Sequence, residues 1–129
     1  MHAGDFIAAS VLRELEALAP VAGVFGNMDD PALKTTLPRE RVLTVEEARI
    51  GLVHIPGPAA GRTERLLSRF PGCGAVVYGH THVPQVERMG GVWILNPGSP
   101  TERRRAPARS MLLLDVAGTE LRPELVPLP

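Results

Sequence analysis

Residues 74–100 read GAVVYGHTHVPQVERMGGVWILNPGSP, and this stretch has a clear alternation of apolar runs and turn residues. A short apolar run at 75–78 precedes a loop that contains two histidines. Two further strand-like runs follow, joined at Gly90-Gly91, and a second loop closes the stretch at 96–100. Short apolar runs between glycine and proline residues are typical of buried strands. The stretch therefore predicts a strand, a loop, a hairpin and a final loop of ordinary turn chemistry.

The segments on either side predict more strands, together with helices. On the C-terminal side, the basic segment RRRAPARS at 103–110 predicts an exposed connection, and the last residues predict a hairpin that turns at Ala117-Gly118. On the N-terminal side the predicted elements are a helix over 5–19 that ends at Pro20, a strand over 21–26, two strands over 41–54 with a tight turn near Glu47 and Ala48, and a helix over 61–70.

The order and number of these elements predict the fold class. Strands alternate with helices in the first half and form hairpins in the second half, which is typical of an α/β sandwich-like domain. The chain has 129 residues, of which 44% are hydrophobic, enough for one modest core. We therefore expect residues 1–129 to form a single domain.

Composition bears on partners and compartment. Fourteen basic residues balance fourteen acidic ones, so no global field would attract the chain to a nucleic acid polymer or an anionic membrane. We expect neither as a partner. No apolar run has the length of a membrane span, and no signal-peptide pattern is present. The single cysteine, Cys73, agrees with a reducing compartment. We therefore expect a cytoplasmic protein.

Five polar residues lie in loops at or just after predicted strand ends, although no predicted strand precedes the first of them. They are Asp5, Asn27, His54, His80 and His82. Because side chains at the same ends of neighbouring strands converge, these residues form a candidate site. Spaced two apart on a segment expected to be extended, His80 and His82 would face the same side and could bind one ligand together.

Structural interpretations of single residues remain open. His54 taken alone is more often a strand-end histidine that bonds to the backbone than a metal ligand. The pair Gly26-Asn27 is compatible with a simple turn. We expect His2 to pack or to cap, and we leave it out of the candidate site.

Five motifs in order carry a resemblance to a known family: HAGD, GNMD, GLVH, YGHTHVP and NPGSP. Together they resemble the calcineurin-like metallophosphoesterase superfamily, most closely its small bacterial and archaeal phosphodiesterases. The resemblance implies a four-layer sandwich of two mixed sheets flanked by helices, with two metal ions at the strand ends. It implies that Asp5 bridges both ions and the water between them. Asn27, His54 and His80 would complete the coordination of the second ion, and His82 would be a ligand of the first.

Two departures from the family pattern affect what we expect. Met28 follows Asn27 where many members have a histidine, although the small phosphodiesterases also lack that histidine. In the family, a strand ending in Asp-x-His, a helix and a second strand come before HAGD, and this sequence has no such segment before Met1. We therefore expect an N-terminally incomplete domain, with only Asp5 and His82 left for the first ion and with reduced activity in the 129-residue form.

The expected function is metal-dependent hydrolysis of a small phosphoester, by a phosphodiesterase or phosphatase. Carboxylate, amide and imidazole ligands suit manganese, which we expect first, and also iron, nickel or zinc. Two alternatives remain: a non-catalytic protein-interaction module on the same fold, and a protein that binds a single metal ion.

Overall fold

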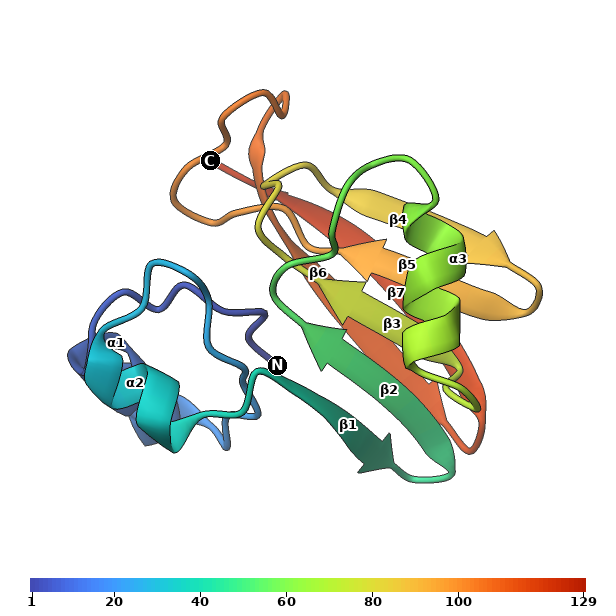
Figure 1. Cartoon of the computed structure of the whole chain (residues 1–129), viewed down its shortest axis with the longest axis horizontal. Coiled ribbons are helices and arrows are strands. Elements are labelled where there is room, and N and C mark those ends of the chain that lie inside the picture. Colours follow the sequence, from blue (N-terminus) through green and yellow to red (C-terminus); the bar gives the residue numbers. More distant parts are fainter.

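A five-stranded mixed sheet forms the centre of the chain, whose computed structural model describes residues 1–129 (Figure 1). Its spatial order is β1-β2-β3-β5-β4. The three inner strands are parallel, and each edge strand pairs antiparallel with its neighbour. The strands are β1 (Glu40–Val45), β2 (Ala48–Val53), β3 (Ala75–Tyr78), β4 (Gln85–Met89) and β5 (Val92–Asn96).

The inner strands are buried on both faces, as their nearly continuous apolar sequences require. Side chains alternate between the two faces, so two apolar clusters form. One cluster includes Ile50, Leu52 and Leu95. The other lies under helix α3 (Arg62–Arg69), which contributes the buried Leu66. This helix confirms the one predicted over 61–70.

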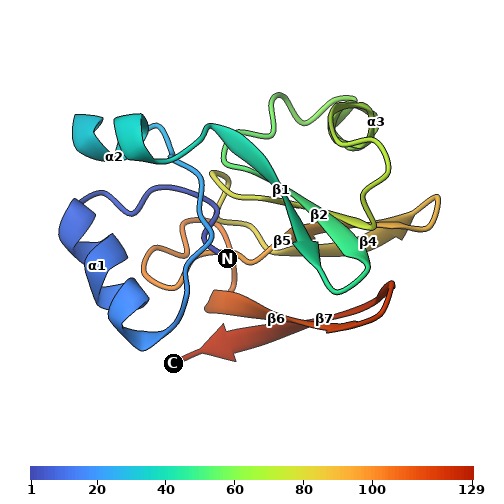
Figure 2. The same ribbon diagram turned by 90° about the horizontal axis from the view of Figure 1, so that it is seen from below.

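The C-terminal hairpin forms a second sheet, as Figure 2 shows. Strands β6 (Arg109–Ala117) and β7 (Glu120–Leu128) pair only with each other. Leu112, Leu114 and Val116 of β6 pack against the first cluster. Helix α3, the central sheet and the hairpin are therefore successive layers. The α/β sandwich of two sheets with helices is confirmed, but only the central sheet is mixed, because β6 and β7 are antiparallel.

Helices α1 (Ala9–Leu18) and α2 (Pro31–Thr36) lie beside the layers (Figures 1 and 2). The prediction of a helix from residue 5 is wrong at its start, since Asp5 and Ile7 adopt left-handed φ angles of 60° and 72°. Helix α1 contains no buried residue. Helix α2 was not predicted; Pro31 occupies its first turn, where the missing amide hydrogen costs nothing. None of the helices has the length and apolar character needed to cross a membrane.

The predicted strand over 21–26 is absent as a regular element. Its only strand-like pairing is one parallel bridge between His2 and Gly23, made by two backbone hydrogen bonds of 2.9 and 3.3 Å. The pairing stops there because Gly4 and Asp5, with φ angles of 96° and 60°, turn the partner segment away. The extended segment nevertheless buries Val24 completely.

Two predicted hairpin turns shift by one residue. The first turn is at Glu46-Glu47, one residue before the predicted position, and the last is at Gly118-Thr119, one residue after it. The Gly90-Gly91 turn lies where it was predicted. The connection over 103–110 is largely exposed, except for the buried Ala106 and Ser110.

Candidate metal centre

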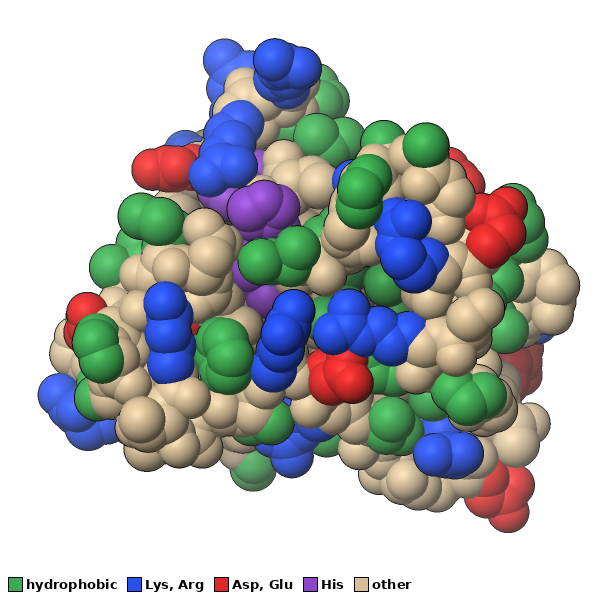
Figure 3. Space-filling model, viewed as in Figure 1, with side chains coloured by type: hydrophobic (Ala, Val, Ile, Leu, Met, Phe, Trp, Pro, Cys, Tyr) green, Lys and Arg blue, Asp and Glu red, His purple; other side chains and the backbone are tan.

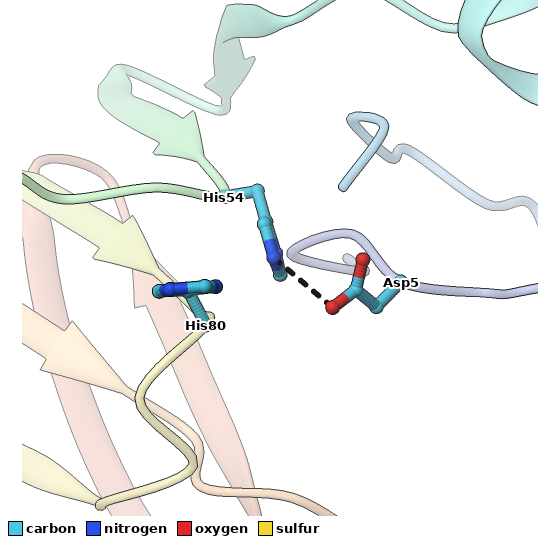
Figure 4. A group of neighbouring side chains, drawn as sticks. All are labelled: Asp5, His54 and His80. Atoms are coloured by element: carbon cyan, nitrogen blue, oxygen red, sulfur yellow. Dashed lines mark ion pairs between the residues drawn. The ribbon is translucent and has the colours of Figure 1, made fainter. Parts of the chain in front are cut away.

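Four of the five predicted site residues converge at one end of the central sheet. Asp5 and Asn27 come from the N-terminal loops, His54 follows β2, and His80 follows β3. Potential ligand atoms of Asp5, His54 and His80 all lie within 4.8 Å of one another, and Figure 4 shows these three side chains. The parallel pairing of β2 with β3 places the two histidines side by side.

His54 is the centre of the group and is only 3% exposed. Its Nδ1 lies 2.7 Å from the carbonyl oxygen of Ala3, which can only accept, so Nδ1 carries a hydrogen. Its Nε2 lies 2.9 Å from Asn27 Oδ1 and 3.1 Å from Asp5 Oδ2. In a neutral His54 these are three acceptor atoms facing one another. A cation held between these atoms would satisfy all three.

The donor set fits a divalent metal ion. Adjacent ligand atoms around an octahedral ion with bonds of about 2.1 Å are separated by about 3.0 Å. The separations around His54 Nε2, 2.9 and 3.1 Å, are of this size. A metal-binding imidazole usually donates its other N–H to a carbonyl or carboxylate, as His54 does to Ala3. Carboxylate, amide and imidazole ligands suit borderline ions.

His80 contributes a second imidazole from a bent loop. Its Nδ1 lies 3.2 Å from Asn27 Oδ1, and its ring meets the ring of His54 edge-on at 5.2 Å. Burial and the nearby His54 lower the pKa of His80, while Asp5 acts in the opposite direction. A lowered pKa keeps the imidazole neutral, which is the form that binds metals.

His82 is not brought into the same group. The expected extended segment is wrong, because His80 and His82 have left-handed φ angles of 67° and 61°. The Nδ1 of His82 instead donates to the carbonyl oxygen of Glu102 at 2.6 Å. This bond leaves Nε2 as the nitrogen with a free lone pair, in the same way as in His54.

Asp29 organises the site although the sequence did not single it out. Its buried carboxylate accepts hydrogen bonds from the amides of Asp5 at 3.1 Å, Ile7 at 2.6 Å and Gly26 at 2.7 Å. These bonds hold the Asp5 loop against the Asn27 loop. The sequence does place an aspartate two residues after Asn27, but a second aspartate, Asp30, follows directly, and the sequence does not distinguish the two.

Asn96 organises the histidine loop from the end of β5. Its fully buried amide donates to the carbonyl of Gly79 at 3.2 Å and to the hydroxyl of Thr81 at 3.0 Å, and its oxygen accepts from Gly98 at 2.9 Å. The loop at 96–100, read from sequence as ordinary turn chemistry, therefore supports the loop that carries His80.

The two N-terminal loops approach each other too closely for side chains at two glycines. A Cβ at Gly26 would lie 2.1 Å from Asp5 Oδ1, and one at Gly4 would lie 2.7 Å from His54 Nδ1. Gly4 also has a φ of 96°, which favours glycine. Glycine at both positions therefore permits the carboxylate of Asp5 to reach the imidazole of His54.

Basic groups surround the candidate ligands. Arg104 donates to the carbonyl of His80 at 3.2 Å, and Lys34 donates to the carbonyl of Asn27 at 3.2 Å. Figure 3 shows basic side chains close to the histidines on this face. Such a setting attracts an anionic ligand.

Comparison with known proteins places the chain in a family. Residues 1–119 match the calcineurin-like phosphoesterase superfamily domain. A probable metallophosphoesterase of Methanothermobacter thermautotrophicus is 38% identical over 128 residues, which are 98% of this chain and 73% of that protein. Another from Methanocaldococcus jannaschii is 35% identical over 131 residues, covering 99% of this chain and 65% of that protein. The chain thus spans roughly two thirds to three quarters of these relatives.

Solved structures agree with this placement. The solution structure of a Thermotoga maritima protein has a TM-score of 0.73 and 36% identity, covering 97% of this chain and 77% of that one. Vps29 of Entamoeba histolytica complexed with Zn²⁺ has a TM-score of 0.76 and 23% identity, covering 97% and 79%, a likeness of fold alone. With the domain match and the two archaeal relatives, these findings show that the chain belongs to the calcineurin-like phosphoesterase superfamily.

Proposed function

We propose that the protein hydrolyses phosphoesters, and phosphodiesters in particular, with two divalent metal ions. The observation that carries the proposal is the meeting of three acceptor atoms at His54 Nε2, Asn27 Oδ1 and Asp5 Oδ2. With His80 they would hold one ion, and Asp5 with His82 would hold its neighbour. Manganese is the ion we propose first, followed by iron, nickel or zinc.

The residues of the chain have defined parts in this reaction. Divalent ions held by these residues would supply Lewis acidity and would lower the pKa of a bound water toward neutral pH. The backbone amide of Asp5 donates a hydrogen bond to the Asp29 carboxylate, which fixes the position of the Asp5 loop. The Oδ1 atom of Asp5 accepts a hydrogen bond from the amide of Met28 at 2.8 Å. Its other oxygen, Oδ2, remains directed at His54. The carbonyl of Ala3 orients His54 in turn, so the ligand atoms are positioned before substrate binds.

A chromogenic phosphodiester tests the proposal. We expect the protein to hydrolyse bis(4-nitrophenyl) phosphate in Mn²⁺, and we expect Asp5→Asn and His80→Ala to abolish hydrolysis and to weaken Mn²⁺ binding measured by calorimetry. His2→Ala, outside the ligand set, should be comparatively mild. Hydrolysis that persists in His80→Ala would remove this histidine from the site.

A non-catalytic interaction module and a single-metal binding protein remain the competing functions. The Vps29 structures, at 23% identity, show a shared fold alone. The set of converging ligand atoms favours a metal-dependent function over a module that needs no metal. Tight binding of one ion per chain without hydrolysis would favour the single-metal alternative, and no metal binding at all would favour the module.

A further inference from the structure

A cavity of about 190 Å³ opens beside the candidate metal centre. Asn27 and His54 form the wall that it shares with the centre, and Lys34 and Arg39 lie on its lining. The rest of the lining includes the apolar side chains Phe25, Val53 and Ile55. A ligand bound at the centre would therefore lie next to this cavity, with Asn27 and His54 common to both.

The two cationic side chains of the cavity lack acidic partners. Lys34 donates to the backbone carbonyl of Asn27 and forms no ion pair. Arg39 makes neither an ion pair nor a side-chain hydrogen bond, although its neighbour Glu40 pairs with Arg69. The cavity thus presents two positive charges, and the guanidinium has all of its donors free.

Cavity size limits what can bind. Pockets for whole drug-sized ligands measure about 300–1,000 Å³, so this cavity fits one substituent of a larger molecule. A free guanidinium matches the two oxygens of a carboxylate or phosphate, and the lysine adds a second charge. The apolar lining suits a short carbon linker between such a group and the metal centre.

We propose that the substrate carries a second anionic group, a carboxylate or a phosphate, which binds Arg39 and Lys34 in this cavity while its phosphoester lies at the metal centre. The inference rests on the proposed function and narrows it to phosphoesters with a neighbouring anion. Arg39 and Lys34 are then specificity-determining residues, distinct from the residues that would hold the metal.

Three phosphonates test this inference on the Mn²⁺-supplemented protein. Butylphosphonate has no second anion, whereas 3-phosphonopropionate adds a carboxylate and propane-1,3-bisphosphonate adds a second phosphonate. Their dissociation constants are measured by calorimetry, and their inhibition constants are measured against bis(4-nitrophenyl) phosphate. We expect at least one anionic probe to bind about tenfold more tightly than butylphosphonate, the effect of about one charged hydrogen-bonded contact. The stronger anionic probe identifies the preferred group.

Variants assign the preference to the cavity. In Arg39→Met, the ratio of the dissociation constant of butylphosphonate to that of the preferred anionic probe should be close to one. Arg39→Lys should retain part of the preference for the anionic probe. Arg13→Met, an exposed arginine of α1, is the matched control and should keep the full ratio. Equal binding of all three probes by the unmodified protein, or an unchanged ratio in Arg39→Met, would overturn the inference. Absence of hydrolysis alongside a retained calorimetric preference would instead contradict the proposed function.

Discussion

Asp29 shows how one buried carboxylate can position a site without being a ligand. It satisfies three backbone amides from two loops, so the position of Asp5 depends on it. Hydrogen bonds to charged groups contribute about 1.5–3 kcal/mol each, and amides left without acceptors inside the protein are costly. The effect of removing this carboxylate should therefore be large.

Asp29→Ala should lower the free energy of unfolding by about 3 kcal/mol, measured by urea denaturation. It should also weaken Mn²⁺ binding, because the Asp5 loop loses the hydrogen bonds to Asp29 that hold it in place. Asp30→Ala is the control, since Asp30 is exposed and makes no side-chain cap bond to α2; it should change stability by less than about 0.5 kcal/mol. Similar effects of the two substitutions would contradict the view that Asp29 holds the Asp5 loop in place.

His2 gives a pH-dependent contribution to stability. Burial lowers its pKa to about 4, assisted by the N-terminal charge and His54 and opposed by Asp29 and Asp5. Its ring stacks on Phe6 at 3.6 Å, and its Nδ1 accepts the amide hydrogen of Gly4 at 3.2 Å. Between pH 6.5 and about 4 the unfolded chain binds the extra proton and the folded chain does not, so stability falls as pH falls through this window.

His2→Asn should reduce this pH dependence while keeping an acceptor for Gly4. Urea denaturation at pH 7.5 and pH 4.5 should show a loss of stability that is about 2 kcal/mol smaller in the variant than in the unmodified protein. An identical pH dependence in both proteins would mean that His2 titrates normally in the folded state.

For single residues, the sequence predicted candidate metal ligands better than the residues that support them. Asp5, Asn27, His54 and His80 could be named because loops at strand ends converge in this fold class. Asp29 and Asn96 act on backbone groups of distant loops, and those contacts exist only once the loops are folded. In the sequence, both residues look like ordinary turn formers.

Helices α1 and α3 differ in how they are anchored. Helix α1 has ten residues and buries none of them, whereas α3 has eight and buries Leu66 completely against the sheet. Helical stability in proteins comes chiefly from packing of an apolar face. Helix α1 should therefore open locally far more often than α3.

Hydrogen exchange measures this difference. We expect amides of α1 to exchange fastest among the helices of eight or more residues, amides of α3 more slowly, and amides of β3 and β5 slowest. The comparison of α1 with α3 is internally matched, because both helices have similar lengths. Equal protection of α1 and β3 would contradict the view that α1 is weakly anchored.

The boundaries of helices and strands could be predicted only where no tertiary contact overrides the local sequence preference. The start of α3 follows its apolar spacing, but the start of α1 does not, because the Asp29 clamp holds Asp5 and Ile7 in left-handed conformations. A branched residue such as Ile7 seldom adopts a φ of 72°. A tertiary contact thus overrides helix propensity at this point.

Across the whole molecule, the candidate site joins two parts of the structure. Asp5 and Asn27 belong to the N-terminal loops beside α1 and α2, and His54 and His80 lie in the loops that follow β2 and β3 of the central sheet. Figure 1 shows the two helices lying away from that sheet. An ion held by all four residues would connect these parts directly.

Mn²⁺ should therefore raise the melting temperature. At a concentration a hundredfold above the dissociation constant, the stabilisation is about 2.7 kcal/mol, which corresponds to roughly 10 °C for a domain of this size. Differential scanning fluorimetry with Mn²⁺ and then EDTA measures the shift and its reversal. Asp5→Asn should lose the shift, and Asp115→Asn in the C-terminal hairpin should keep it. An undiminished shift in Asp5→Asn would place the ion elsewhere.

The large separation of the site residues along the chain also has a kinetic consequence. The contact between His54 and Asn27 joins residues 27 positions apart, and that between His80 and Asn27 joins residues 53 positions apart. The contact of His80 with Asn27 closes a longer loop than the pairing of β2 with β3 does, and contacts that close longer loops tend to form later. Interactions absent from the folding transition state change the unfolding rate and leave the refolding rate nearly constant. Mn²⁺ should accordingly lengthen the lifetime of the native chain in stopped-flow unfolding without accelerating its formation.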